Sequence, residues 1–235
     1  MTNSYIAVDL ETTGLDPKLD KIIEIGAVRV EDGAAVAEFV TFVNPYRQMT
    51  ERVTELTGIT DSDLAGAPGI EEVIGKFIDF AGELPLLGHH IILDFSFLKR
   101  AAVNQGLTFE RSGIDTLVLA RLFMPQEEKK NLHAACCYFG VEQETVHRAM
   151  ADAAASHLLY QEMGKRFDGE RPNAFSEKSL IYKVKREQPA SKRQKEHLQY
   201  LVKYHKISLT VQIDHLSRNE ISRITDKIIA QYGRI

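Results

Sequence analysis

The sequence has little cysteine and no long apolar run. Its 235 residues include two cysteines, Cys136 and Cys137, which are adjacent. Adjacent cysteines provide neither a disulfide framework nor the ligand spacing of a metal site, so a reducing compartment is the simplest expectation. No apolar stretch is long enough to cross a bilayer, and residues 1–5 lack the basic and apolar segments of a signal peptide. We therefore expect a cytoplasmic protein that has no membrane partner.

Uniform charge is also absent. The formal net charge is −4, but residues 1–175 carry 16 Lys and Arg against 27 Asp and Glu, a balance of −11. Residues 176–235 carry 13 basic and 6 acidic side chains, a balance of +7. A basic end on an acidic body indicates contact with something anionic. A solvated basic face is an equally good interpretation of the same counts.

Periodic patterns of apolar residues predict an α/β protein. Alternation predicts three strands at 5–11, 22–30 and 35–43, with a hairpin turn at 31–33. Later strands are expected at 84–88 and 112–115, and helices at 70–81, 95–103, 116–123 and 149–166. Asn131 is expected to be the N-cap of another helix, which runs through Phe139. Strands that come first and then alternate with helices predict a mixed β-sheet flanked by helices.

The end of the sequence predicts two further helices. Each begins with a capping box, Ser191 to Gln194 in the first and Ser217 to Glu220 in the second. Their apolar stripes are expected to face each other and to form a thin core. The expected division of the chain is a main domain at 1–168, a linker at 169–189 and a small helical module at 190–235.

Asp9-Leu10-Glu11 ends the first predicted strand. The two-residue period of a strand puts both carboxylates on one face, about 7 Å apart, where they repel each other. A bound cation would relieve this repulsion, and oxygen ligands favour Mg²⁺ or Mn²⁺. An isolated Asp-x-Glu at a strand end is more often only solvated, so the pair needs further partners.

Three later residues are candidate partners. Asp94 is expected at the start of a helix, where Asp is also a common N-cap. His147 and Asp152 are five positions apart, so they do not share a helix face. They can act together if His147 lies on the loop before a helix and Asp152 lies in its first turn. Taken alone, each of the three also fits a structural role.

The Asp9–Glu11 pair and its three candidate partners are together sufficient for phosphodiester hydrolysis. Two divalent cations held by shared carboxylates can activate a water and stabilise the leaving oxygen. A histidine can take the proton from the attacking water. The predicted catalytic set is Asp9, Glu11, Asp94, His147 and Asp152, of which the four acids are predicted metal ligands.

Three motifs, in this order, resemble those of the DEDDh exonucleases of the RNase H-like superfamily. They are Asp9–Leu15 (DLETTGL), Gly88–Leu98 (GHHIILDFSFL) and His147–Asp152 (HRAMAD). Similar supporting segments are Ile22–Ala27, Val43–Pro45 and Leu56–Thr60. The likeness covers roughly the first 165 residues and is strongest to the proofreading exonucleases of bacterial DNA polymerase III. It implies an RNase H-like mixed sheet.

The resemblance also implies a role for each catalytic residue. Asp9 would bridge both metal ions, and Glu11 and Asp152 would complete the site of the ion that activates water. Asp94 would help to hold the second ion. His147 would be the general base, which places the chain in the DEDDh branch.

Substrate contacts are implied as well. Backbone groups around Thr12, Thr13 and Gly14 would meet the 3′-terminal sugar, and Leu15 would press against the terminal base. His90 stands where the family usually has Asn, and we retain it as a candidate contact to the strand. Leu93 stands where the family commonly has Phe. Neither difference removes a metal ligand.

The expected function is therefore a metal-dependent 3′–5′ exonuclease that uses two Mg²⁺ or Mn²⁺ ions and releases nucleoside monophosphates from single-stranded or frayed DNA. An exoribonuclease that trims RNA 3′ ends is one alternative. A non-catalytic module that binds nucleic acid or a polymerase is another. The expected partner is the 3′ end of a single-stranded DNA, and the C-terminal helices could dock a DNA polymerase or a repair protein.

Overall fold

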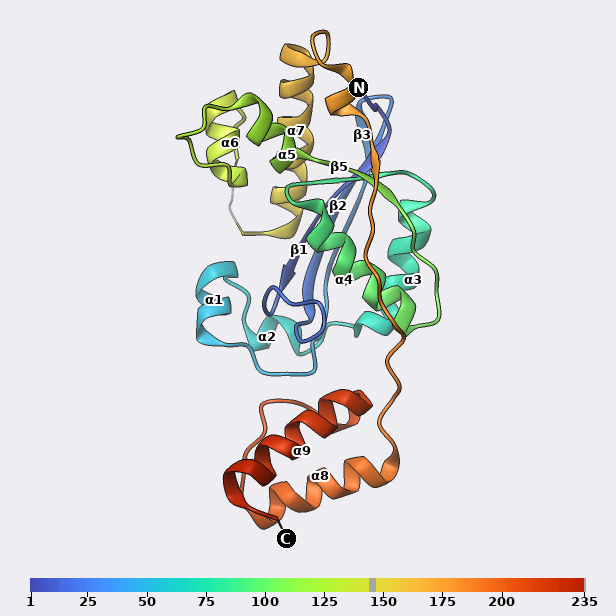
Figure 1. The fold of residues 1–235 in the computed structure, drawn as a ribbon, viewed down its shortest axis with the longest axis vertical. Coiled ribbons are helices and arrows are strands. Elements are labelled where there is room, and N and C mark those ends of the chain that lie inside the picture. The colour runs from blue at the N-terminus through green and yellow to red at the C-terminus, as the bar shows by residue number, and fades with distance from the viewer. Residues whose placement is uncertain (144–146, 235) are drawn as a thin grey trace. The chain divides into compact units, whose positions relative to one another are not determined.

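The computed structural model describes residues 1–143 and 147–234. These residues form two compact units, which are considered separately (Figure 1). Unit 1 contains Met1–Pro45 and Met49–Val184, and unit 2 contains Tyr46–Gln48 and Lys185–Ile235. Within the described residues, no helix combines the length and the apolar character that crossing a bilayer requires.

Unit 1 is built on a mixed sheet. The strands that the structure describes are β1 (Tyr5–Thr12), β2 (Ile22–Glu31), β3 (Ala34–Phe42), β4 (Leu86–Gly88), β5 (Ser112–Asp115) and β6 (Lys178–Ser179), in the order β3-β2-β1-β4-β5-β6. Strand β2 is antiparallel to β1 and β3, whereas β4 is parallel to both β1 and β5. The carboxyl ends of β1, β4 and β5 therefore lie at one edge of the sheet.

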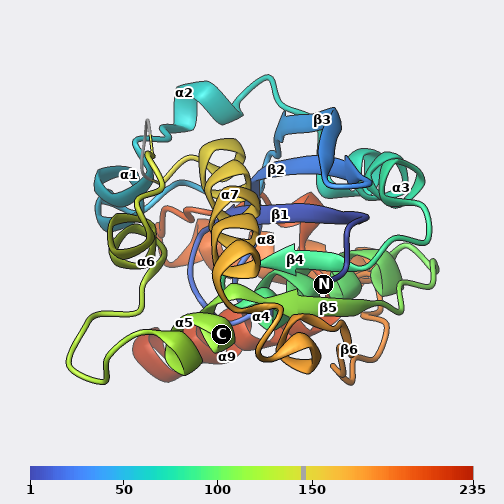
Figure 2. The same ribbon diagram turned by 90° about the horizontal axis from the view of Figure 1, so that it is seen from above.

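Helices cover both faces of this sheet (Figure 2). They are α1 (Glu51–Thr57), α2 (Asp61–Leu64), α3 (Ile70–Ala81), α4 (Ile91–Asn104), α5 (Thr116–Phe123), α6 (Leu132–Phe139) and α7 (Ala149–Phe167), followed by the 3₁₀ turn η1 (Pro172–Phe175). On one face, α3 and α4 pack against alternate residues of β1, including Val8 and Leu10. On the other face, α5, α6 and α7 pack against Tyr5 and Ala7.

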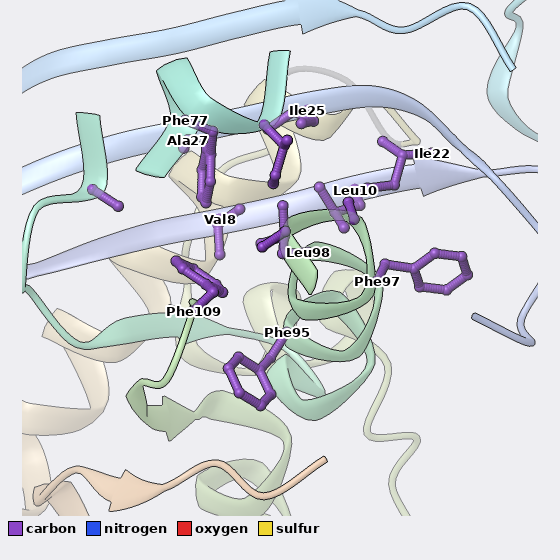
Figure 3. Packing of buried hydrophobic residues seen from close by; sticks show 14 of the residues in the cluster. Val8, Leu10, Ile22, Ile25, Ala27, Phe77, Phe95, Phe97, Leu98 and Phe109 are labelled. Atoms are coloured by element: carbon purple, nitrogen blue, oxygen red, sulfur yellow. The ribbon is translucent and has the colours of Figure 1, made fainter. Parts of the chain in front are cut away.

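The α3–α4 side of the core is rich in phenylalanine (Figure 3). Phe77, Phe95 and Phe109 are fully buried, and Phe109 lies 6.1 and 6.0 Å from the other two ring centroids. Each buried ring contributes roughly 2–3 kcal/mol by leaving water. This packing fixes α4, and with it Asp94, against the sheet.

The strands and long helices follow the sequence expectations, with three differences. Helix α4 begins at Ile91 rather than near Phe95; His90 occupies the N-cap position in a left-handed backbone conformation (φ 77°), and its side chain makes no capping hydrogen bond. Helices α1 and α2 are short and were not expected. Lys178 and Ser179, in the segment expected as a linker, pair with β5 and extend the sheet.

Unit 2 is a helical hairpin. Helices α8 (Lys192–Tyr204) and α9 (Arg218–Tyr232) flank the 3₁₀ turn η2 (Ile213–His215). Both expected capping boxes are present, at Ser191 and at Ser217. The core is small, and its buried residues are Leu198, Leu201, Leu216, Ile221 and Ile228.

A short segment from the middle of the chain completes unit 2. Arg47 donates a hydrogen bond to Glu220 (3.1 Å), a carboxylate that is 6% exposed. The ring of Tyr46 stacks on that of His215, with 3.4 Å between centroids. A thin core therefore gains polar and aromatic contacts from residues 46–48.

Candidate active site

Three acids meet where β1 ends. Asp9 and Glu11 lie two positions apart on β1, and the Glu11 side chain is buried. Asp94, in the first turn of α4, accepts a hydrogen bond from the backbone N–H of Leu10 (3.2 Å). The second motif is thereby held directly against the strand that carries the first.

The start of α7 brings the third motif to the same place. His147 lies outside the helix with φ 61°, and Asp152 lies in its first turn, as the spacing required. Asp152 accepts hydrogen bonds from the His147 backbone N–H (3.1 Å) and from the Gln143 side chain. One carboxylate therefore orients the segment that carries the histidine.

Glu24 joins the sheet to this segment. It lies on β2 beside Glu11 and is 1% exposed. It accepts hydrogen bonds from Arg148 (2.9 and 3.3 Å) and from the Ala149 backbone N–H (3.1 Å), at the amino end of α7. The helix N-terminus and the guanidinium together balance the buried charge.

Gly26 allows α7 to approach the sheet. It is the second residue after Glu24 on the same strand, and a Cβ there would overlap the backbone of Ala149 and Met150. A glycine is needed because no side chain fits between the strand and the helix. This close packing sets the position of Asp152 relative to Asp9 and Glu11.

The electrostatics of the site favour a bound cation. Burial, followed by repulsion from Asp152 and Glu24, raises the pKa of Glu11 to about 7. Burial raises the pKa of Asp94 to about 8 and that of Asp152 above its ordinary value. For Asp9, burial and then the charges of Asp94, Asp152 and Glu11 raise the pKa well above the usual range. Four acids in one place resist ionisation unless a positive charge joins them.

The arrangement also fits a metal ion by geometry. Glu11, His147 and Asp152 each offer one ligand atom, and these atoms lie within 4.8 Å of one another. Carboxylate oxygens are hard ligands that suit Mg²⁺ and Mn²⁺. The site is therefore a cluster of acids, built around the end of β1, that can hold a divalent cation.

The loop after β1 carries the other candidate contacts. The Thr12 hydroxyl donates to the Gly14 carbonyl (2.7 Å). The Thr13 hydroxyl accepts from the Lys21 backbone N–H (3.0 Å), which closes the loop. Leu15 is 78% exposed, although it is a large apolar residue. Nothing within the described part of the loop buries it, so it is available to an apolar ligand surface.

His90 and His89 have different surroundings. His90 is exposed, and its backbone N–H donates to Asp115 (3.0 Å). Its left-handed conformation is one that Asn, Asp and His adopt more readily than most residues. His89 is held by Thr116 (2.9 Å) and the Lys130 carbonyl (2.6 Å), and burial lowers its pKa.

The five expected catalytic residues thus come from three separate parts of the chain and meet at one place. Sequence reasoning did not assign functions to Glu24, Arg148 or Gln143. The sequence does mark Glu24 as unusual, since it is the one charged residue in the apolar run Ile22–Ala27. Its partner could not be identified, because Arg148 is 124 positions away in the chain.

An acidic site at the end of the first strand of a mixed sheet, with a histidine beside it, has the composition of a metal-assisted hydrolase site. Residues 6–160 match the model of a family described as RNase_T, Exonuclease. This match spans most of unit 1, and the chain belongs to that exonuclease family.

The chain is also similar in sequence to DNA polymerase III proteins. The chain is 40% identical over 154 residues to the PolC-type DNA polymerase III of Clostridium perfringens, a match that covers 66% of this chain and 11% of that protein. It is 37% identical over 161 residues to the DNA polymerase III subunit epsilon of Aquifex aeolicus, covering 68% of this chain and 80% of the relative.

Solved structures share the fold at low sequence identity. One is Escherichia coli exonuclease I in complex with a dT13 oligonucleotide, with a TM-score of 0.64 and 17% identity over 73% of this chain and 43% of that one. A zinc-bound complex of the same exonuclease with single-stranded DNA gives a TM-score of 0.63 and 18% identity over 74% and 42%. Both likenesses extend over about the length of unit 1.

Proposed function

We propose that this protein is a metal-dependent 3′–5′ exonuclease that removes nucleoside monophosphates from single-stranded or frayed DNA. The observation that carries the proposal is the meeting of Asp9, Glu11, Asp94 and Asp152 beside His147. Family membership and the names of the relatives support the same reaction.

In this proposal the four acids bind metal ions and His147 acts as the general base. The four acids would hold two divalent cations, Mg²⁺ or Mn²⁺, which supply an activated water and stabilise the leaving oxygen. His147 would accept the proton of the attacking water through a ring nitrogen, since one of its ring nitrogens lies within 4.8 Å of ligand atoms of Glu11 and Asp152. The backbone contact between His147 and Asp152 keeps this base next to the acids.

The loop after β1 gives the preference for a strand end. Backbone groups around Thr12, Thr13 and Gly14 receive the terminal sugar, and the exposed Leu15 side chain packs against the terminal base. His90 contacts the strand from the start of α4. A frayed end enters most readily, because unstacking a paired terminus costs free energy that a mismatch lowers.

The names of the relatives place them in DNA polymerase III, and this supports proofreading beside a DNA polymerase as the setting. If so, a primer with a mismatched 3′ end should be shortened faster than a matched one on the same template. Equal rates on both primers would instead favour general removal of single strands.

The experiment that tests the reaction is a time course on 5′-labelled DNA and RNA single strands with Mg²⁺, Mn²⁺ or chelator. The expected result is a metal-dependent ladder that shortens from the 3′ end and is absent for Asp9→Ala/Glu11→Ala. Faster shortening of RNA would reassign the enzyme to RNA trimming. Strand binding without a ladder in either metal would refute catalysis and leave a binding module.

A further inference from the structure

Unit 2 exposes tyrosines that its own core does not use. Tyr200, Tyr204 and Tyr232 are 54%, 59% and 47% exposed, and none belongs to the buried cluster of the hairpin. Large rings left in water lose the stabilisation that burial would provide. Their exposure is therefore not explained by the stability of unit 2.

These rings lie next to one another. Tyr200 and Tyr204 are one helical turn apart on α8, with 6.2 Å between ring centroids. Tyr204 contacts His205 at 5.0 Å, and His205 contacts Tyr232 at 5.4 Å. A continuous row of rings thus runs from α8 to the end of α9.

Basic side chains accompany the rings. Arg193 and His197 precede Tyr200 and Tyr204 at spacings of four, three and four, which puts all four on one side of α8. Arg193 and Lys203 are exposed and form no ion pair with any residue that the structure describes. We call this set the tyrosine surface; its members are Arg193, His197, Tyr200, Lys203, Tyr204 and Tyr232.

The net positive charge of unit 2 indicates an anionic partner. Unit 2 carries twelve Lys and Arg against five Asp and Glu, although unit 1 is acidic. One acid, Glu196, lies four positions before Tyr200 and borders the tyrosine surface, where Lys192 approaches it (3.8 Å). Exposed aromatic rings among cations match single-stranded nucleic acid, whose bases stack and whose phosphates need positive charge.

We propose that the tyrosine surface binds single-stranded nucleic acid, independently of the hydrolytic site. Bases stack on the tyrosine rings, and Arg193 and Lys203 contact phosphates. A strand bound here stays attached to the chain that carries the acid cluster, which raises its effective concentration between hydrolytic events. This activity goes beyond the proposed hydrolysis, because it requires no metal ion.

The test uses the full chain with Asp9→Ala/Glu11→Ala, in chelator, and measures the anisotropy of a labelled single-stranded DNA. Tyr200→Ala/Tyr204→Ala should weaken binding by about 30-fold or more, since stacking contributes about 1–3 kcal/mol per base and two rings are lost. Tyr200→Phe/Tyr204→Phe keeps the rings and should bind within about 3-fold of the parent. Gln199→Ala, an exposed change on the same helix, is the matched control.

Charge is tested separately. Arg193→Ala/Lys203→Ala should make the dependence of binding on salt shallower, by about 1.4 in the logarithmic slope for two lost phosphate contacts. Unchanged binding by both double alanine variants would overturn the proposal and leave the surface to a protein partner. Because hydrolysis is abolished in every sample, failure of the proposed nuclease activity would not alter this result.

Discussion

Arg148 and Glu24 form an ion pair (2.9 Å) that ties β2 to the residue next to His147. Glu24 is 1% exposed, whereas the Arg148 side chain is 49% exposed. Loss of the ion pair would destabilise the protein mainly through Glu24, because a buried carboxylate without hydrogen-bond donors has a high free-energy cost. The pair acts on the site by holding the start of α7.

Glu24→Gln should lower kcat by roughly 10- to 100-fold, as is typical when a group that orients metal ligands is changed. The glutamine side chain has the shape of Glu24 but lacks the negative charge that interacts with Arg148 and with the N-terminus of α7. Steady-state hydrolysis of a DNA single strand measures the effect. Glu31→Gln on the same strand removes an exposed pair with Arg29 (2.8 Å) and should change kcat by less than about 2-fold.

Gly26→Ala should destabilise the protein by about 2 kcal/mol or more, because its Cβ meets the backbone of α7. The metal-induced rise in Tm should also diminish, since Asp152 moves with the helix. Gly75→Ala is the control: a Cβ there meets nothing within 4 Å, and an alanine inside α3 should stabilise by about 0.5–1 kcal/mol. Chemical denaturation of both variants gives the comparison, and equal effects would contradict close packing at Gly26.

Metal-free protein should lose stability as the pH rises from about 4.5 to about 8. The raised pKa values of Glu11 and Asp94 mean that the native site retains protons that the unfolded chain has already released, so unfolding becomes easier as pH increases. Added Mn²⁺ should raise Tm more at about pH 8 than at about pH 5.5, because protons compete with the metal. A metal effect independent of pH would argue against binding by these acids.

His147→Gln should reduce kcat by about 10²- to 10⁴-fold, the usual contribution of a general base. The rise in Tm with Mn²⁺ should persist, because the acids that hold the ion remain. This outcome distinguishes a base from a ligand, which matters because a His147 nitrogen lies within 4.8 Å of the ligand atoms of Glu11 and Asp152. Loss of the metal effect would make His147 a ligand instead.

Leu15→Ala should raise KM for single-stranded DNA by roughly 3- to 10-fold and leave kcat nearly unchanged, because the lost contact is apolar and binds the terminal base. Leu19→Ala is a matched change in the same loop, where the side chain is 42% exposed. Its KM should stay close to that of the parent. Equal effects of the two substitutions would indicate that the loop is merely loosened.

Local patterns determined how much of this structure could be predicted. Alternation and capping boxes are properties of neighbouring residues, so β1, β2 and α9 could be anticipated closely. The meeting of Glu24 with Arg148, and of Gly26 with α7, depends on residues far apart in the chain. Helix α4 begins four residues before the predicted start at Phe95, because His90, which is not a typical capping residue, occupies the N-cap position in a left-handed conformation. The acids could be identified from motifs, but their surroundings required the packed structure.

Unit 2 is not a simple appendage, because Tyr46–Gln48 belong to it. The chain passes between the two units after Pro45, after Gln48 and after Val184. A domain joined by one linker can be gained or exchanged by a single recombination at its boundary. Here such an event would separate Arg47 from Glu220 and Tyr46 from His215. Substitutions in the helical hairpin and in residues 46–48 therefore constrain one another.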